Sequence, residues 1–274
     1  MPTSALLLAL ASAVVHAGWN LLLARADDSR TSAAAQVLVA MAVWAIPCLV
    51  AARIDSEALP YLAGAAVFQL GYFALLAAAY DSGELSLVYP LARGGAPLIV
   101  AMVAAFGAGG SFGAGQAIGI VAIALGVIAV RGLRGPWRGR DTVLALGTAA
   151  CIAGYTVLDR YGVRHANPLT YVWFELLLTA VVYSAWVLRT RGAARLRAAF
   201  NRSTVIAGIG GIGAYVLVLA ALRLSAAAPV AAVRETSVVL VVIAGAVVLG
   251  EKVTTARYAG AVVVVAGIML VALG

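Results

Sequence analysis

Four charged residues interrupt segments of the chain that are otherwise strongly apolar: Arg93, Glu175, Arg234 and Glu235. A charge inside a membrane-spanning segment costs about 2.5–3.5 kcal/mol on insertion scales, which makes such residues candidates for function. Arginine offers a planar, permanently charged fork to a carboxylate, phosphate or phosphonate. A carboxylate in an apolar cavity can bind a proton near neutral pH. We therefore expect both arginines to bind substrate, and Glu175 or Glu235 to carry a coupling proton.

A structural role is the alternative for each charge. Arg93 lies in "YPLARGGAPL", where it would form a buried ion pair or extend to the membrane interface. Either glutamate could instead bridge to Arg234. Pro97 lacks an N–H, and the neighbouring glycines loosen the same turn, so we expect a broken or kinked helix beside Arg93.

Polar and aromatic side chains recur at helical spacing in further apolar segments, for example Ser12, His16, Trp19 and Asn20. One reading makes them part of the substrate site, and the other makes them packing residues or interfacial belts. Besides the two arginines, the residues predicted to contact substrate are Tyr89, His16, Trp19, Asn20, Tyr72 and Tyr155.

The composition identifies the surroundings of these residues. The chain has 274 residues, of which 64% are hydrophobic and 11% charged, with a mean hydropathy of +1.03. A soluble surface needs far more polar groups, so we expect an all-α membrane protein. Breaks at charges, Gly and Pro divide the chain into ten predicted transmembrane helices. Their ranges are 4–24, 31–52, 58–80, 86–106, 113–130, 141–159, 168–188, 203–222, 228–249 and 256–273.

The net charge of +8 comes mainly from arginines clustered between the apolar segments. That distribution is typical of membrane topology and does not favour a nucleic-acid partner. The two cysteines show neither metal-ligand spacing nor a disulfide framework, so we expect no metal site.

The segments form a weak internal repeat. "AGWNLL" from Ala17 resembles "AGYTVL" from Ala153, and the separation of Gly119 from Gly260 equals that of Arg93 from Arg234. Residues 1–135 and 136–274 are thus predicted to be two five-helix repeats. Because five is odd, the second repeat would enter the membrane from the opposite side, as in many secondary transporters. Small residues in 113–130 and 256–273 would fit these helices to the bundle or to a second copy in a homodimer.

Several motifs resemble the drug/metabolite transporter superfamily, in its EamA-like branch of ten-helix permeases. They are "HAGWN" from His16, "YPLARGGAPL" from Tyr89, "PVAAVRETS" from Pro229 and "LGEKVT" from Leu249. The resemblance implies a gradient-driven carrier or exchanger of small metabolites that needs no ATP or other cofactor. In agreement, the sequence lacks a phosphate-binding G-x-x-x-x-G-K-[ST] loop. The first repeat has no counterpart of Glu251.

We therefore expect a multi-pass protein of the cell (inner) membrane that moves a small anionic or zwitterionic metabolite by alternating access, proton-coupled or exchange-driven. The alternative is an exporter of neutral or cationic compounds in which the arginines are structural. A membrane-embedded enzyme or a channel is a reading of a different class; the sequence has no H-E-x-x-H or G-x-S-x-G motif. Arginine-rich connections at 131–141 and 189–202 favour a cytoplasmic location for those loops and both termini outside, whereas the family resemblance implies both termini inside.

Overall fold

The computed structural model describes residues 1–23, 28–82, 85–107, 113–131, 139–237, 239–240 and 254–273. Within these ranges the chain is almost entirely helical, and its only strand-like feature is an isolated bridge between Ile54 and Ala166. The α-helices are α1 (Thr3–Leu23), α2 (Ser29–Val50), α3 (Leu59–Ser82), α4 (Leu85–Gly107), α5 (Ala114–Arg131), α6 (Gly139–Gly162), α7 (Pro168–Arg191), α8 (Ala193–Ala198), α9 (Arg202–Leu224), α10 (Ala227–Arg234) and α12 (Thr255–Leu273).

The predicted all-α membrane fold is confirmed. Five helical segments are long and apolar enough to span a bilayer: Arg30–Val50, Ser56–Leu76, Thr142–His165, Pro168–Arg191 and Arg202–Leu224. Shorter apolar helical stretches lie within α1, α4, α5 and α12. Nine of the ten predicted segments coincide with a helix to within a few residues. The exception is 228–249, whose last nine residues lie outside the described ranges.

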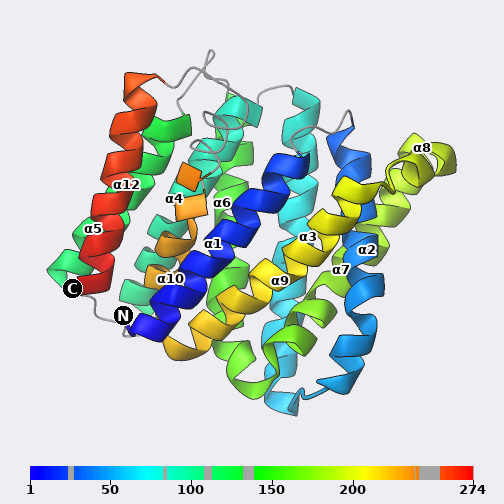
Figure 1. Ribbon diagram of the computed structural model, residues 1–274, viewed down its shortest axis with the longest axis horizontal. Coiled ribbons are helices and arrows are strands. Elements are labelled where there is room, and N and C mark those ends of the chain that lie inside the picture. The colour runs from blue at the N-terminus through cyan, green and yellow to red at the C-terminus, as the bar shows by residue number, and fades with distance from the viewer. Residues whose placement is uncertain are drawn as a thin grey trace.

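The helices run side by side through one bundle, with α5 and α12 at one edge and α2 and α7 at the other (Figure 1). Helices distant in sequence pack closely: α1 against α9, α3 and α4 against α6, and α2 against α7. Both termini lie at one end of the bundle, and α8 lies at the opposite end (Figure 1). This packing brings residues from both halves of the chain into one centre.

Glycines allow α5 and α12 to approach at backbone distance. A Cβ atom added to Gly119 would lie 2.6 Å from the carbonyl oxygen of Gly267, and one added to Gly267 would lie 2.7 Å from that of Gly119. A Cβ atom added to Gly126 would likewise lie 2.8 Å from the carbonyl oxygen of Gly260. The small residues predicted at these positions thus fit the two helices to each other.

The helix break lies in a different place from the one predicted. The α4 helix continues through Pro97 to Gly107. Gly94 serves packing instead, since a Cβ there would lie 2.9 Å from the carbonyl oxygen of Ala124 in α5. The interruption occurs in the second half, where α10 ends at Arg234 and Glu235 forms a turn. Tertiary packing against α5 keeps α4 helical despite the proline.

The arginine-rich connection after α7 contains a sharp turn. Gly192 has φ +84° and follows Arg191, the last residue of α7; α8 starts at the next residue. This backbone conformation strains any residue with a Cβ atom. The residues of α8 are not buried, and the α8 helix carries Arg195 and Arg197.

Candidate substrate and proton site

The centre of the bundle contains a buried ion pair between the two halves of the chain. Arg93 Nη1 of α4 donates to Glu235 Oε1, which follows α10, over 3.1 Å. Their side chains are only 5% and 3% exposed. Of the two carboxylates predicted as possible partners of Arg234, Glu235 therefore pairs with Arg93 instead. Adjacent residues on a helix point about 100° apart, so only one of Arg234 and Glu235 can face α4.

His16 of α1 extends this ion pair. Its Nε2 atom lies 2.7 Å from Arg93 Nη2. A guanidinium group can only donate, so Nε2 must accept and the imidazole must be the neutral tautomer with its proton on Nδ1. His16 therefore stabilises Arg93 without adding a second positive charge.

Two other polar residues of the α1 stripe have separate surroundings. The Trp19 ring packs edge-on against His16 with ring centroids 4.7 Å apart, and its indole N–H has no partner among the described residues. Ser12 donates a 2.7 Å hydrogen bond to the Ala214 carbonyl oxygen, which joins α1 to α9. The side chains of Asn20 and Tyr89 lie outside the described residues.

Arg234 belongs to a second, neighbouring cluster. Its guanidinium carbon lies 5.1 Å from the ring centroid of Tyr215 in α9, at cation–π distance. The Tyr215 hydroxyl donates to Oδ2 of Asp159 in α6. Among the described residues Arg234 makes no ion pair, and its Nε is buried without a partner. Of the two central arginines, Arg234 is therefore the one without an ion pair to a described carboxylate.

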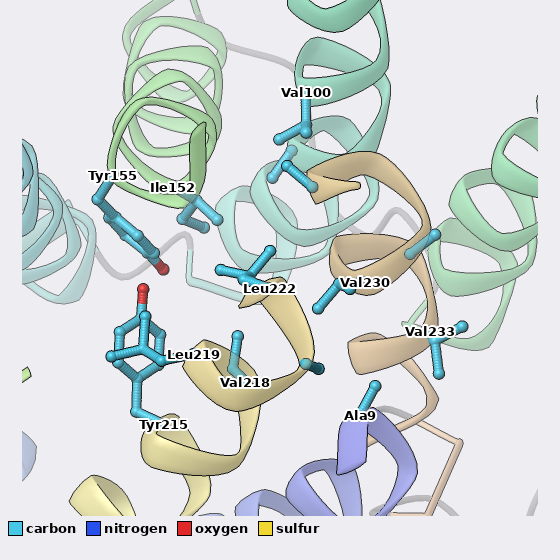
Figure 2. Close-up of a cluster of buried hydrophobic side chains, with 14 of the residues drawn as sticks. Ala9, Val100, Ile152, Tyr155, Tyr215, Val218, Leu219, Leu222, Val230 and Val233 are labelled. Atoms are coloured by element: carbon cyan, nitrogen blue, oxygen red, sulfur yellow. The ribbon is translucent and has the colours of Figure 1, made fainter. Parts of the chain in front are cut away.

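Aromatic rings surround this second cluster. Tyr155 packs edge-on against both Tyr72 and Tyr215, with ring centroids 6.3 Å and 6.0 Å apart. The hydroxyl groups of Tyr155 and Tyr215 point toward each other at one side of a cluster of buried apolar side chains that includes Ile152 and Leu222 (Figure 2).

Glu175 of α7 completes the second cluster. Its side chain is fully buried, and neither carboxylate oxygen has a hydrogen-bond partner among the described residues. The charges that act on it are Asp159 and Arg234. The Tyr171 hydroxyl, one turn earlier, is also unpartnered and would lie 2.5 Å from a Cβ added to Gly162 of α6. Tyr171 therefore lies against the same end of α6 as Asp159.

The charges of the centre do not balance if every acid is ionised. Three buried carboxylates, Asp159, Glu175 and Glu235, face two buried arginines, and His16 is neutral. Among the described residues, no group of three or more His, Cys, Asp or Glu could hold a metal ion.

The structure thus groups His16, Trp19, Arg93 and Glu235 in one cluster, and Arg234, Tyr72, Tyr155 and Glu175 in or around the other. Sequence reasoning missed Asp159 and Tyr215 as members of the site. Asp159 had a detectable signal. The consecutive segments contain "YTVLD" from Tyr155 and "YVWFE" from Tyr171, which both place a tyrosine and an acid one turn apart on one helical face.

Comparisons with known proteins agree with this architecture. Residues 142–273 match the model of the EamA-like transporter family. A structure described only as "Crystal structure of protein" is similar in fold, with a TM-score of 0.80 and 18% sequence identity, over 100% of this chain and 99% of that one. A search of curated protein sequences finds no match. Members of the matched family are small-molecule transporters of the membrane and not enzymes. Through residues 142–273, the chain is therefore similar to the EamA-like transporter family, which is part of the drug/metabolite transporter superfamily.

Proposed function

We propose that the protein is a secondary carrier that moves a small metabolite with an acidic group across the cell membrane by alternating access. A zwitterion fits the site better than a simple anion. Arg234 is buried yet uncommitted, so its guanidinium can bind a carboxylate, phosphate or phosphonate. Asp159 and Glu175 supply negative charge beside it for a positive group. The uncommitted guanidinium of Arg234 is the observation that carries this proposal.

The remaining predicted residues have supporting roles in this proposal. Tyr72 and Tyr155 would provide ring faces against the substrate, and Trp19 an unused N–H donor. Arg93 and His16 would hold the end of α10, and therefore Arg234, in position. An interrupted helix beside the substrate is a recurring arrangement in secondary transporters.

Helix packing supports two inverted repeats, 1–135 and 136–274, as the basis of alternating access. Suppose that α1 corresponds to α6, α2 to α7, and α3 to α9. The contact between α1 and α9 then has the contact between α6 and α3 as its counterpart in the other repeat. In the same way, the contact between α2 and α9 corresponds to that between α7 and α3. Both members of each exchange are in contact. With α4 matched to α10, the α4–α6 pair likewise becomes α10–α1. Such an exchangeable arrangement would let the two repeats swap roles between inward-open and outward-open states.

Counterflow in proteoliposomes tests the proposal with three probes that share a two-carbon skeleton: β-alanine, propionate and ethylamine. Labelled β-alanine should exchange fastest, propionate more slowly and ethylamine least. Arg234→Met should abolish β-alanine exchange, and Arg234→Lys should restore little because an ammonium cannot make bidentate contacts. Exposed Arg53 provides the matched control, Arg53→Met. Exchange of β-alanine at the wild-type rate by Arg234→Met would refute the assignment.

A cation exporter is the second candidate, because the centre of the bundle holds three buried carboxylates, Asp159, Glu175 and Glu235, but two buried arginines, Arg93 and Arg234. In that case Arg234 would be structural, and Asp159 with Glu175 would bind the substrate. Counterflow of ethylamine but not of β-alanine would favour this function over the zwitterion carrier.

A further inference from the structure

Asp159 and Glu175 form a pair of acids that the ion pair of the centre does not use. Both side chains are 0% exposed. Asp159 accepts one hydrogen bond, from the Tyr215 hydroxyl, and its Oδ1 atom has no partner in the described part of the chain. Both oxygens of Glu175 are unpartnered there as well. These are the least compensated acids in the centre.

The groups around the pair come from several helices. Tyr155 is on α6 with Asp159, and Tyr171 is on α7 with Glu175. Tyr215 of α9 contacts Asp159, and Arg234 of α10 acts on both acids. Further away, α4 contributes Arg93, α1 contributes neutral His16, and α3 contributes Tyr72 next to Tyr155. Glu235 acts on Arg234 but is bonded to Arg93. Of the two central arginines, Arg234 is therefore the one for which the described residues show no bond to a carboxylate.

One uncommitted arginine can balance one of the two acids. A second ionised carboxylate would be a buried charge with no counter-charge, which is strongly unfavourable. Two acids that act on each other relieve this by retaining a proton, as paired carboxylates in other proteins do. Tyr171, whose unpartnered hydroxyl is buried against the same turn of α6, provides a donor beside the pair.

We infer that Asp159 and Glu175 hold one proton as a unit, and that this pair is the proton-coupling site of the carrier. The coupling role rests on the proposed transport function, whereas the shared proton does not. It replaces Glu235 as a candidate, because protonating Glu235 would break its bond to Arg93. Substrate and proton are linked through Arg234. An acidic group bound to Arg234 removes the counter-charge of the pair and strengthens its hold on the proton, whereas a positive group near the pair displaces it.

Infrared spectroscopy of the purified protein in nanodiscs tests the shared proton without any substrate. At neutral pH the wild type should show the C=O stretch of a protonated carboxylic acid. Glu175→Gln and Asp159→Asn should each remove this band, because the remaining acid is then balanced by Arg234 and ionises. Loss in both variants is the signature of a shared proton. The exposed control Glu57→Gln should retain the band.

Three outcomes would overturn the inference: no protonated carboxyl band in the wild type, a band that survives both substitutions, or a band removed by only one of them. Should either variant fail to fold, Asp159→Glu and Glu175→Asp keep both acids, and each should shift the band in frequency without removing it. If neither Asp159→Glu nor Glu175→Asp shifts the band, the assignment is contradicted.

The coupling role has its own measurement. Proteoliposomes containing a pH-sensitive dye should report proton movement when a gradient of β-alanine is imposed, and Glu175→Gln should abolish it. If β-alanine exchange fails in the wild type while the infrared result holds, the proposed substrate is wrong and the proton site stands. If exchange proceeds and Glu175→Gln moves protons as the wild type does, the coupling role is refuted.

Discussion

Removal of one member of the Arg93–Glu235 pair should destabilise the protein much more than removal of both. Arg93→Met leaves Glu235 as a buried charge without its partner, and Glu235→Leu does the same to Arg93. The double variant Arg93→Met/Glu235→Leu leaves neither charge. It should therefore be more stable than either single variant, although a charge has been lost at both positions.

The magnitude follows from the geometry of the pair. At 3.1 Å and an effective dielectric constant of about 20, the attraction is about 5 kcal/mol. Loss of one partner of a buried pair typically costs about 3–5 kcal/mol. In any variant that lacks Arg93, the His16 acceptor also loses its donor, at about 1–3 kcal/mol. We expect the double variant to retain only this last cost.

The free energy of unfolding can be measured in mixed micelles by titration with a denaturing detergent, followed by tryptophan fluorescence. The surface pair Arg53–Asp55 is the internal control, since its side chains are 74% and 46% exposed and its N–O distance is 4.0 Å. Arg53→Met should change stability by less than about 1 kcal/mol. A double central variant as unstable as the sum of its two single variants would refute the ion-pair reasoning.

Two further predictions concern other parts of the bundle. Gly119→Ala should lower the free energy of unfolding by about 1–3 kcal/mol, because its Cβ would lie 2.6 Å from a backbone oxygen of α12. Gly139→Ala is the control, since a Cβ there would have no atom within 4 Å and should leave stability unchanged. Equal stability of the two variants would contradict the close packing of α5 and α12. The second prediction uses Ala193→Cys, in exposed α8, in a chain lacking the native cysteines. This cysteine should react with a membrane-impermeant maleimide only after the cells are permeabilised, because the arginine-rich loop is expected to be cytoplasmic. Ready labelling in intact cells would reverse the orientation.

Much of the architecture could be predicted from composition and spacing. Apolar runs of about 20 residues that end at charges, Gly or Pro are sufficient to place helices, because every backbone polar group in lipid must be satisfied within its own segment. The charged residues Arg93, Glu175 and Arg234 were recognisable as central for a related reason, since a charge in such a segment must face the protein interior. The motifs around Arg93 and Arg234 also indicated the family that residues 142–273 match.

The partners of these charges depended on the tertiary structure. Glu235 follows Arg234 directly, yet it bonds to Arg93, because the packing of α10 against α4 decides which residue faces which helix. The helix break was predicted at Pro97 from local chemistry, but packing against α5 keeps α4 intact and the interruption follows Arg234. Asp159 could not be distinguished from an interfacial acid near a helix end until α7 and α9 enclosed it. The sequence by itself thus determined where the apolar helices lie and which charges must be buried, since both follow from the cost of exposing polar groups to lipid. Only the tertiary structure decided which charges neutralise one another, because that depends on contacts between helices far apart in the chain.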